Sequence, residues 1–383
     1  MKSILLIAYP YAASGANMLR YRSFANHLVK RGYDVDVIGY YELKGDSGDG
    51  IRYYKLKARF GIDFIYSFFV MFFTYTYLIR VQGLKAYVRR VGLASMTYAQ
   101  AVKLLKRCNY EACLVGVLPW AYYLLIPFMK KYVRTVVDIS DPLYKNAIND
   151  NSHHPANLRL EREALICADH VVTMNEPTVP IMTGEMGVPS EKISFISPAM
   201  NIDTVEIGLP KVFSHDIPLR VIYSGSLYAG YRDLSEIQPA VESMCGDVVL
   251  DVYSNSVYKP KETPNVHMHR VVEHGQILRL YQQYDVLLFV DNAYGYQVPS
   301  KIFELLAQNK PILFVYDTRN HYFRDMLDGQ KGIHFVVNKE MQIEKTLREL
   351  TRSTHLEVHY NFDLQPYTED MVNRSLEHAM LVR

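Results

Sequence analysis

The fold of this chain can be approached from residues 291–312, DNAYGYQVPSKIFELLAQNKPI. An apolar run of Val, Leu and Phe precedes them at 286–290, and a second apolar run follows at 311–315. Short apolar runs of this kind are typical of parallel strands that are buried on both faces. Between the runs, Pro and Ser at 299–300 predict a helix start, and residues 302–307 supply an apolar helix face. The order strand, helix, strand predicts an α/β protein with a parallel sheet.

Three polar residues, Ser300, Lys301 and Glu304, stand at the start of this predicted helix, just past the carboxyl end of a parallel strand. Open α/β sheets bind ligands at that edge, and the free amides of a helix N-terminus attract phosphate. Lys301 adds a positive charge there, and Glu304 can accept hydrogen bonds from sugar hydroxyls. Since a phosphate beside a hydroxylated ring is a nucleotide, the pattern favours a nucleotide site. The alternative is an ordinary Lys and Glu on an exposed helix face.

The segment PSKIFE at 299–304, followed by LLA and by KPI at 310–312, resembles the donor-site signature of GT-B glycosyltransferases. It is most similar to the family 4 retaining enzymes and their relatives in polysaccharide assembly. The resemblance implies that Glu304 binds the ribose of a nucleoside-diphosphate sugar and that the helix start faces the diphosphate. Many members carry two glutamates separated by seven residues, and Tyr296 stands at the first of these positions. Sugar contacts are therefore expected from Tyr296, Gln297 or nearby backbone groups.

The composition limits the possible classes of protein. The chain has 383 residues, of which 49% are hydrophobic, so two domains can each bury a core. Its formal net charge of +2 argues against a nucleic-acid binder. The four cysteines are scattered, without Cys-x-x-Cys pairs or zinc spacing, which indicates a reduced, cytoplasmic protein with no metal site. The first eight residues read as a buried strand and not as a signal peptide.

Alternating strand-like and helix-like segments predict two Rossmann-like domains with parallel sheets, which face each other in the GT-B arrangement that the resemblance implies. Residues 1–200 are expected to form an acceptor domain, and residues 201–363 a donor domain that binds the nucleotide sugar. Residues 364–383 are expected to form a crossover helix that packs back on the first domain. The absence of Gly-x-Gly-x-x-Gly after the first strand disfavours a dinucleotide-dependent dehydrogenase.

The acceptor side of the site is expected to involve two segments of the first domain. In similar enzymes the loop and helix start after the first strand serve this purpose, and the matching residues here are Ser14, Gly15, Asn17 and Arg20. Arg20 could hold an acceptor phosphate, although a solvated arginine on a helix face fits the pattern equally. At the end of the strand predicted for 135–139, we expect Asp141 to meet the acceptor hydroxyl or the transferred sugar and Asp138 to hold the loop. Helix capping and a structural carboxylate are the alternatives.

The diphosphate side is expected in the second domain, at the loop Gly225-Ser226 after its first strand. In the resembled family this loop often carries an Arg, with a Lys a few residues later. Ser226 takes the first position, and Arg232 is the nearest basic candidate for the second. Lys301, Arg232 and backbone amides can then neutralise the leaving diphosphate by electrostatic stabilisation. No cofactor beyond the donor substrate is expected.

The segment FIYSFFVMFFTYTYLI at 64–79 contains no charged residue, and lysines and arginines flank it on both sides. It is shorter than the roughly 20 apolar residues that a spanning helix needs. Aromatic side chains favour the membrane interface, and the flanking cations attract anionic headgroups. We therefore expect residues 60–92 to dock on the inner face of the cell membrane. The alternative is a core helix of the first domain.

Together, these patterns predict an enzyme that moves a sugar from a UDP- or GDP-linked donor to a lipid-linked or glycan acceptor in cell-surface polysaccharide synthesis. Retention of configuration is implied by the resemblance. Two other functions fit the same architecture. One is a sugar-nucleotide 2-epimerase, which would need no docking segment. The other is a catalytically degenerate scaffold, which the Tyr at position 296 keeps open.

Overall fold

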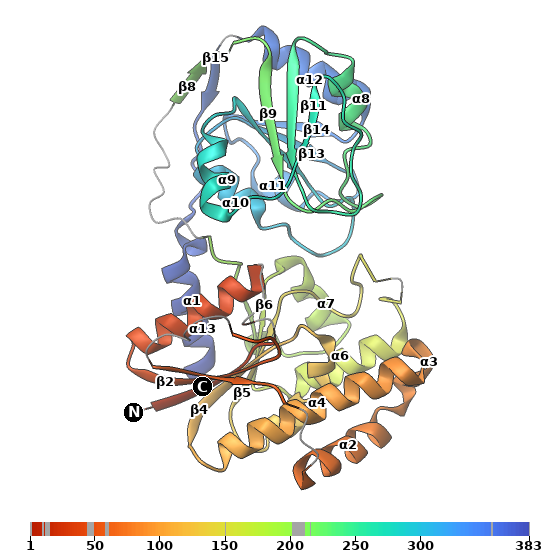
Figure 1. The fold of residues 1–383 in the computed structure, drawn as a ribbon, viewed down its shortest axis with the longest axis vertical. Helices are drawn as coiled ribbons and strands as arrows, with labels where there is room; N and C mark the ends of the chain where they lie inside the picture. Colours follow the sequence, from red (N-terminus) through yellow and green to blue (C-terminus); the bar gives the residue numbers. More distant parts are fainter. Residues whose placement is uncertain are drawn as a thin grey trace. The chain divides into compact units, whose positions relative to one another are not determined.

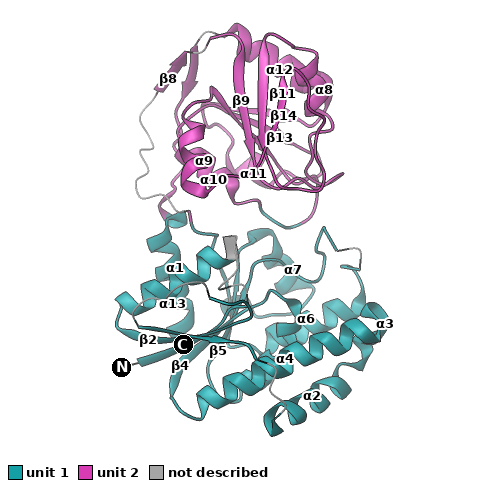
Figure 2. Cartoon of the chain, in the orientation of Figure 1, with its two compact units in different colours: residues 1–199, 296–298, 366–383 teal, residues 200–295, 299–365 magenta. Residues whose placement is uncertain are grey.

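The computed structural model describes residues 2–9, 11, 16–43, 50–57, 61–149, 151–200, 211–214, 216–353 and 355–382. Ser14 and Gly15 lie outside these residues, and only the backbone of Asn17 is described. The chain divides into two compact units (Figure 2). Unit 1 comprises residues 1–199, 296–298 and 366–383, and unit 2 comprises residues 200–295 and 299–365.

Unit 1 is built on a parallel sheet with the strand order β3-β2-β1-β4-β5-β6-β7. Side chains alternate between the two faces of a strand. In β1, Leu5 and Ile7 accordingly enter one hydrophobic core, while Ile4 and Leu6 enter a second core on the opposite face. In chain order the strands are β1 (Lys2–Ile7), β2 (Tyr33–Gly39), β3 (Ile51–Lys55), β4 (Tyr110–Gly116), β5 (Thr135–Ile139), β6 (His170–Thr173) and β7 (Ile193–Phe195).

Helices cover both faces of this sheet (Figure 1). The core with Ile4 and Leu6 lies under α1 (Ala16–Lys30) and α13 (Glu369–Leu381). The core with Leu5 and Ile7 lies under the remaining helices of unit 1, which are α2 (Ile62–Thr74), α3 (Ile79–Gln82), α4 (Leu84–Leu105), α5 (Ile126–Met129), α6 (Pro155–Cys167) and α7 (Val179–Gly184). Because both faces are covered, the central strands β1 and β4 contain continuous apolar runs, at 4–7 and 112–115.

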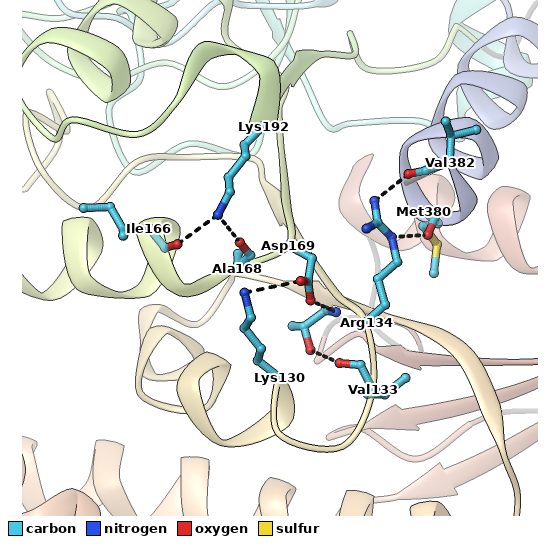
Figure 3. A network of polar contacts seen from close by, with 10 residues as sticks. Lys130, Val133, Arg134, Ile166, Ala168, Asp169, Lys192, Met380 and Val382 are labelled. Carbon is cyan, nitrogen blue, oxygen red and sulfur yellow. Dashed lines mark hydrogen bonds and ion pairs between the residues drawn. The ribbon is translucent and has the colours of Figure 1, made fainter.

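The C-terminal helix α13 is anchored in unit 1 at both its side and its end. His27 on α1 lies 2.8 Å from the Glu377 carboxylate on α13. At the helix end, the Arg134 guanidinium donates to the carbonyls of Met380 at 2.8 Å and Val382 at 2.7 Å (Figure 3). The last carbonyls of a helix have no intrahelical partners and carry partial negative charge. Arg134 therefore satisfies and neutralises the end of α13.

The aromatic segment forms α2 and its continuation. α2 packs along α4, where the buried Tyr87 hydroxyl donates to the carbonyl of Phe72 at 2.5 Å. A short 3-10 helix (Thr76–Leu78) and α3 follow α2. Among the described residues no single helix meets the length and composition needed to cross a membrane. α2 and the segment Thr76–Gln82 meet these length and composition criteria only when they are taken together, and the two are bent by 63° relative to each other.

Unit 2 contains a second parallel sheet, with the order β11-β10-β9-β12-β13-β14. Its strands are β9 (Leu219–Ser224), β10 (Val248–Tyr253), β11 (Val266–His269), β12 (Val286–Val290), β13 (Ile312–Tyr316) and β14 (Ile333–Val337). Its helices are α8 (Ile237–Glu242), α9 (His274–Tyr281), α10 (Lys301–Ala307), α11 (Tyr322–Met326) and α12 (Glu340–Arg352). β8 (Lys211–Ser214) and β15 (His355–Val358) form a separate antiparallel pair.

The strand, helix and strand predicted around residues 291–312 are confirmed as β12, α10 and β13. All five residues of β12 are buried, and Ile302, Phe303, Leu305 and Leu306 bury the apolar face of α10. Asn309 ends the turn with φ of 50°, a left-handed conformation that Asn tolerates better than most residues. Ser300 precedes the helix in a helical conformation, and its side chain makes no capping hydrogen bond.

Candidate functional site

The Glu304 carboxylate is the centre of a polar cluster in unit 2. It lies on α10, and only 15% of its side chain is exposed. Lys301 Nζ lies 2.8 Å from Oε1, and the Tyr281 hydroxyl donates to the same oxygen at 3.3 Å. His274 Nε2, at the start of α9, lies 2.9 Å from Oε2. Two helices thus direct one cation, one phenol and one imidazole toward a single carboxylate.

The surroundings of Glu304 keep the pair with Lys301 ionised. Burial alone would raise the pKa of the Glu304 carboxyl, but the hydrogen bond from His274 and the charge of Lys301 outweigh burial and lower it to about 2. Burial likewise acts to lower the pKa of Lys301, but Tyr281 and Glu304 outweigh it, so that the pKa lies above its usual value. At neutral pH the site therefore presents a carboxylate and an ammonium group side by side.

The Gly225-Ser226 turn lies beyond the end of β9. The Tyr223 hydroxyl donates to the Ser226 carbonyl at 3.0 Å and supports the turn from below. Gly225 has φ of 151°, and a Cβ atom there would lie 3.3 Å from the Tyr223 hydroxyl, so the position suits glycine. Burial raises the pKa of Tyr223 to about 12, and the charges of Arg232 and Lys301 oppose that shift. Both predicted diphosphate cations therefore act on the same region of unit 2.

Three further features of unit 2 lie at or just after the carboxyl ends of its strands. Arg232 is held in a backbone bridge with Tyr228, and its guanidinium lies 5.6 Å from the Tyr228 ring centre. Asp291 follows β12 directly and is 4% exposed. A cavity of about 250 Å³ lies at the ends of β10 and β11, with a lining of Ser254, Asn255, Lys259, Met268, His269 and Arg270.

In unit 1 the structure brings Arg20 and Asp138 together in a buried ion pair. Arg20 Nε and Nη2 donate to the two Asp138 oxygens at 2.9 and 3.0 Å, and Nη1 donates to the Ser197 carbonyl at 2.9 Å. Arg20 is 4% exposed and Asp138 is fully buried. Arg20 is therefore no solvated arginine on a helix face, and its donors expected for an acceptor phosphate are engaged by the protein. The pair instead ties α1 to the end of β5.

Asp141 lies in the loop after β5 and is partly buried. Gln297 Nε2 donates to Asp141 Oδ1 at 2.6 Å. Residues 296–298 belong to unit 1, as Asp141 does. Burial raises the pKa of the Asp141 carboxyl, and the hydrogen bond from Gln297 opposes that shift. Tyr296, which was expected among the donor contacts, lies in unit 1 with its ring centre 5.8 Å from Lys145 Nζ. The structure therefore groups Tyr296 and Gln297 with Asp141 in unit 1.

Glu161 on α6 holds the same loop from inside. Its carboxylate accepts from the Tyr144 amide at 2.7 Å, the Leu143 amide at 3.3 Å and the Tyr123 hydroxyl at 2.5 Å. Glu161 is fully buried, and burial raises its pKa to about 7 despite these three donors. The sequence did not predict this role of Glu161, because the two amides that it binds lie 17 and 18 residues away along the chain.

Sequence patterns missed several members of these clusters. Tyr281 and Tyr223 appeared only as apolar positions of a helix and a strand, and His274 had no clear role. A polar residue immediately after an apolar strand is the one signal that could have selected Asp291. In the part of the chain that the structure describes, no three His, Cys, Asp or Glu side chains are grouped closely enough to hold a metal ion.

Comparison with known proteins identifies the fold. No family model and no curated protein matches the sequence. Among solved structures, a sucrose-phosphate synthase from Thermosynechococcus elongatus is similar over 99% of this chain and 98% of its own, with a TM-score of 0.60 and 12% identity. HepE from Anabaena, in complex with UDP and glucose, is similar over 99% of both chains, with a TM-score of 0.61 and 10% identity.

A glycosyltransferase from Rickettsia africae is similar over 99% of this chain and 97% of its own, with a TM-score of 0.59 and 10% identity. Each likeness covers both Rossmann-like units and both parallel sheets. The predicted fold class is thereby confirmed. The chain has the α/β fold of the GT-B glycosyltransferases.

Proposed function

We propose that this protein transfers a glycosyl group from a nucleoside-diphosphate sugar to a glycan or lipid-linked acceptor. The observation that carries the proposal is the ionised Glu304 carboxylate, held by Lys301, His274 and Tyr281 at the carboxyl edge of the sheet of unit 2. That edge is where open α/β sheets bind nucleotides. The similar structure of HepE contains UDP-glucose, which supports a sugar nucleotide as the donor.

The residues of unit 2 fit the two parts of a nucleotide. A carboxylate has about four lone-pair directions, and Glu304 uses three of them for its neighbours. A ribose hydroxyl can donate to the remaining direction or replace the 3.3 Å contact from Tyr281. Lys301 and Arg232 supply positive charge for a diphosphate, and the charge that develops on that leaving group is the main obstacle to glycosyl transfer. Electrostatic stabilisation of this charge accelerates the reaction.

On the acceptor side, we assign Asp141 to the acceptor hydroxyl. Burial raises the pKa of its carboxyl, which makes the carboxylate a better proton acceptor than an exposed one. Gln297 and the loop bound by Glu161 hold Asp141 in place. Retention of configuration and membership of family 4 are part of the proposal, and they rest on the resemblance of residues 299–312 to that family.

A donor screen tests the reaction. The purified protein is incubated with UDP- and GDP-sugars, with and without a lipid extract as acceptor, and release of nucleoside diphosphate is measured. We expect release that depends on the extract and falls at least tenfold in Lys301→Ala, with Lys345→Ala, an exposed lysine on α12, as the matched control. Epimerised sugar nucleotide without any acceptor would instead support a 2-epimerase. Absence of nucleotide binding would support a degenerate scaffold.

We further propose that the protein docks on an anionic membrane surface through one face of α2. Five side chains on this face are exposed by 49% to 87% although all are apolar or aromatic, and they are Ile62, Ile65, Tyr66, Phe69 and Phe73. Their spacing places them on one side of the helix. The opposite side is packed, since Ser67 and Met71 are fully buried against unit 1. We call these five residues the α2 face.

Charge supports a bilayer as the partner of the α2 face. The helices that follow it add exposed cations, namely Arg80, Lys85 and Arg89, and exposed apolar side chains at Leu84 and Val88. Aromatic rings insert at the level of lipid headgroups, while nearby cations attract anionic lipids. A lipid-linked acceptor, a role in cell-surface polysaccharide synthesis and a place on the cytoplasmic side of the membrane follow as parts of this proposal. The four cysteines are free thiols, which suits a reducing compartment.

A further inference from the structure

The carboxyl ends of β9 and β12 form a distinct position in unit 2. β9 is the first strand of this parallel sheet in chain order. It has β10 on one side and β12 on the other. The strand order therefore reverses between β9 and β12. In open α/β sheets the ligand crevice lies outside the strand ends at such a reversal. Gly225 follows β9 and Asp291 follows β12, so both residues stand at this crevice.

Asp291 is a buried acid with unused hydrogen-bonding capacity. Its side chain is 4% exposed, and Oδ1 accepts from the neighbouring Asn292 amide at 2.7 Å. Within the described residues Oδ2 is buried and has no hydrogen-bond partner. A buried polar atom without a partner is uncommon in native proteins, because it loses water and gains nothing in exchange. Oδ2 is therefore a buried acceptor that a ligand donor could satisfy.

Arg232 offers the complementary group. Within the described residues its Nε is buried and has no acceptor, although other parts of the side chain are exposed. Its guanidinium lies over the Tyr228 ring. Burial raises the pKa of the Asp291 carboxyl to about 7, and the hydrogen bond from the Asn292 amide and the charge of Arg232 partly oppose that shift. The buried Nε–H donor and the buried Oδ2 acceptor stand in loops that follow the paired strands β9 and β12, and neither has a hydrogen-bond partner among the described residues.

The loops that carry both residues are fixed to one another. The Ala293 amide donates to the Tyr231 carbonyl at 2.8 Å, and the Asp291 amide donates to the Val315 carbonyl at 2.9 Å. The Asn320 side chain donates to the Asn292 carbonyl at 2.9 Å. These bonds hold the unpaired oxygen and the unpaired nitrogen in a defined arrangement before any ligand arrives, as a preformed binding site requires.

The chemistry of the two groups selects their ligand. A phosphate oxygen would suit Arg232 but would be repelled by Asp291, and an amine would suit Asp291 but be repelled by Arg232. A hydroxyl group satisfies both, because it can donate to Oδ2 and accept from Nε–H. We propose that Asp291 and Arg232 together bind a hydroxyl group on the sugar of the donor nucleotide. This inference deepens the proposed function and rests on it.

The test compares a sugar nucleotide with its bare nucleotide. Calorimetric titration of the full chain with UDP-glucose, UDP-galactose, UDP-N-acetylglucosamine and GDP-mannose, each beside UDP or GDP, first finds the sugar that adds most to affinity. The ratio of the two dissociation constants is then measured in Asp291→Asn, Asp291→Ala and Arg232→Gln. Asp285→Asn is the matched control, since Asp285 precedes the other end of β12 and binds the Arg220 amide at 2.8 Å.

We expect the contribution of the sugar to fall by about ten- to hundredfold in Asp291→Ala and Arg232→Gln, as for a hydrogen bond to a charged group. Affinity of Asp291→Ala for the bare nucleotide should stay within about threefold, because Glu304 and Lys301 are intact. The melting temperature of Asp291→Asn should be no lower than that of the wild type, since this variant removes a buried unpaired charge. If Asp291→Ala does not fold, the sugar contribution is measured in Asp291→Asn in its place.

Three results would overturn the inference and leave the nucleotide site standing. The variants could keep the full sugar contribution, which would mean that the two side chains do not bind the sugar. The Asp291 variants could lose bare nucleotide and sugar nucleotide equally, which would indicate a structural role; Arg232→Gln is itself expected to weaken both, because Arg232 also supplies charge for the diphosphate. In the wild type, the sugar could add nothing for any donor. A wild-type protein that binds no nucleotide at all would contradict the proposed function itself.

Discussion

Lys301 Nζ and Glu304 Oε1 lie 2.8 Å apart, one helical turn from each other on α10. We assign each to a different part of a nucleotide, and each helps to keep the other ionised in a largely buried position. A helical pair at this spacing on a solvated surface contributes only a few tenths of a kcal/mol. Here both side chains are at least two-thirds buried, so loss of one partner leaves the other charge poorly compensated.

This pairing predicts a stability profile at acid pH. The Glu304 pKa is about 2 in the folded protein and about 4.5 in an ordinary glutamate, so its stabilising effect is present above about pH 4.5 and is lost as the pH falls toward 2. A shift of this size corresponds to about 3 kcal/mol. Urea unfolding between pH 7 and 3 should show a steeper loss in the wild type than in Glu304→Gln. If the free energy of unfolding fell equally with pH in the two proteins, the low pKa assigned to Glu304 would be contradicted.

Glu161 predicts the opposite trend at higher pH. Burial raises its pKa to about 7, so the unfolded state releases the proton first, and stability falls as the pH rises from about 4.5 to 7. Glu161→Gln keeps an acceptor and should flatten this part of the curve. Glu161→Ala leaves the Tyr123 hydroxyl and two amides without an acceptor and should cost about 2–4 kcal/mol. Equal stability of the Gln and Ala variants at pH 7 would show that these hydrogen bonds contribute nothing.

The Arg20–Asp138 pair predicts a structural effect at a position expected to touch the acceptor. Arg20→Ala leaves a buried carboxylate unpaired and should cost about 3–5 kcal/mol. Arg31→Ala, at an exposed position just past the end of α1, should cost less than about 0.5 kcal/mol. The double variant Arg20→Met, Asp138→Leu should recover most of the loss. If Arg20→Ala melted like the wild type and weakened only the use of acceptor, the acceptor contact would be correct instead.

The α2 face predicts binding to anionic liposomes in co-sedimentation. Phe69→Ser with Phe73→Ser should weaken binding by about tenfold or more per ring, because each ring loses its burial in the interface. Val257→Ser with Met341→Ser is the control, since these residues are exposed apolar side chains of unit 2. Binding should also fall with salt and with neutral lipid. Equal binding of all variants, no binding by the wild type, or a concentration-dependent dimer abolished by the two Ser substitutions would each contradict a membrane partner.

Much of the fold could be predicted because it depends on local patterns. The apolar runs of β1, β5 and β12 have the length of buried strands, and residues 299–307 combine a helix start with an apolar face. The aromatic segment was open to two interpretations, a membrane-docking helix and a core helix, and its membrane role stays a proposal. Met71 belongs to the core, whereas Phe69 and Phe73 are exposed, and only the packing of α2 on α4 separates the two sides.

The site was harder to predict because its contacts span long distances in sequence. Glu304 could be selected from its motif, but His274 lies 30 residues earlier and Asp138 lies 118 residues from Arg20. No periodicity reveals such pairs. Asp291 shows the same limit, since its unpaired oxygen becomes visible only when the neighbouring loops are in place. Ser14 and Gly15 lie outside the described residues, so their acceptor role stays a prediction.

Titration calorimetry with UDP and GDP, in the wild type and in Glu304→Gln, bears on the whole account. We expect the wild type to bind one of the two nucleotides, and Glu304→Gln to bind it at least tenfold more weakly. Glu344→Gln on α12, where Glu344 is partly exposed and pairs with Arg348, is the control and should leave binding unchanged. Wild-type affinity in Glu304→Gln, in a protein shown to be folded, would mean that the nucleotide does not bind at this carboxylate.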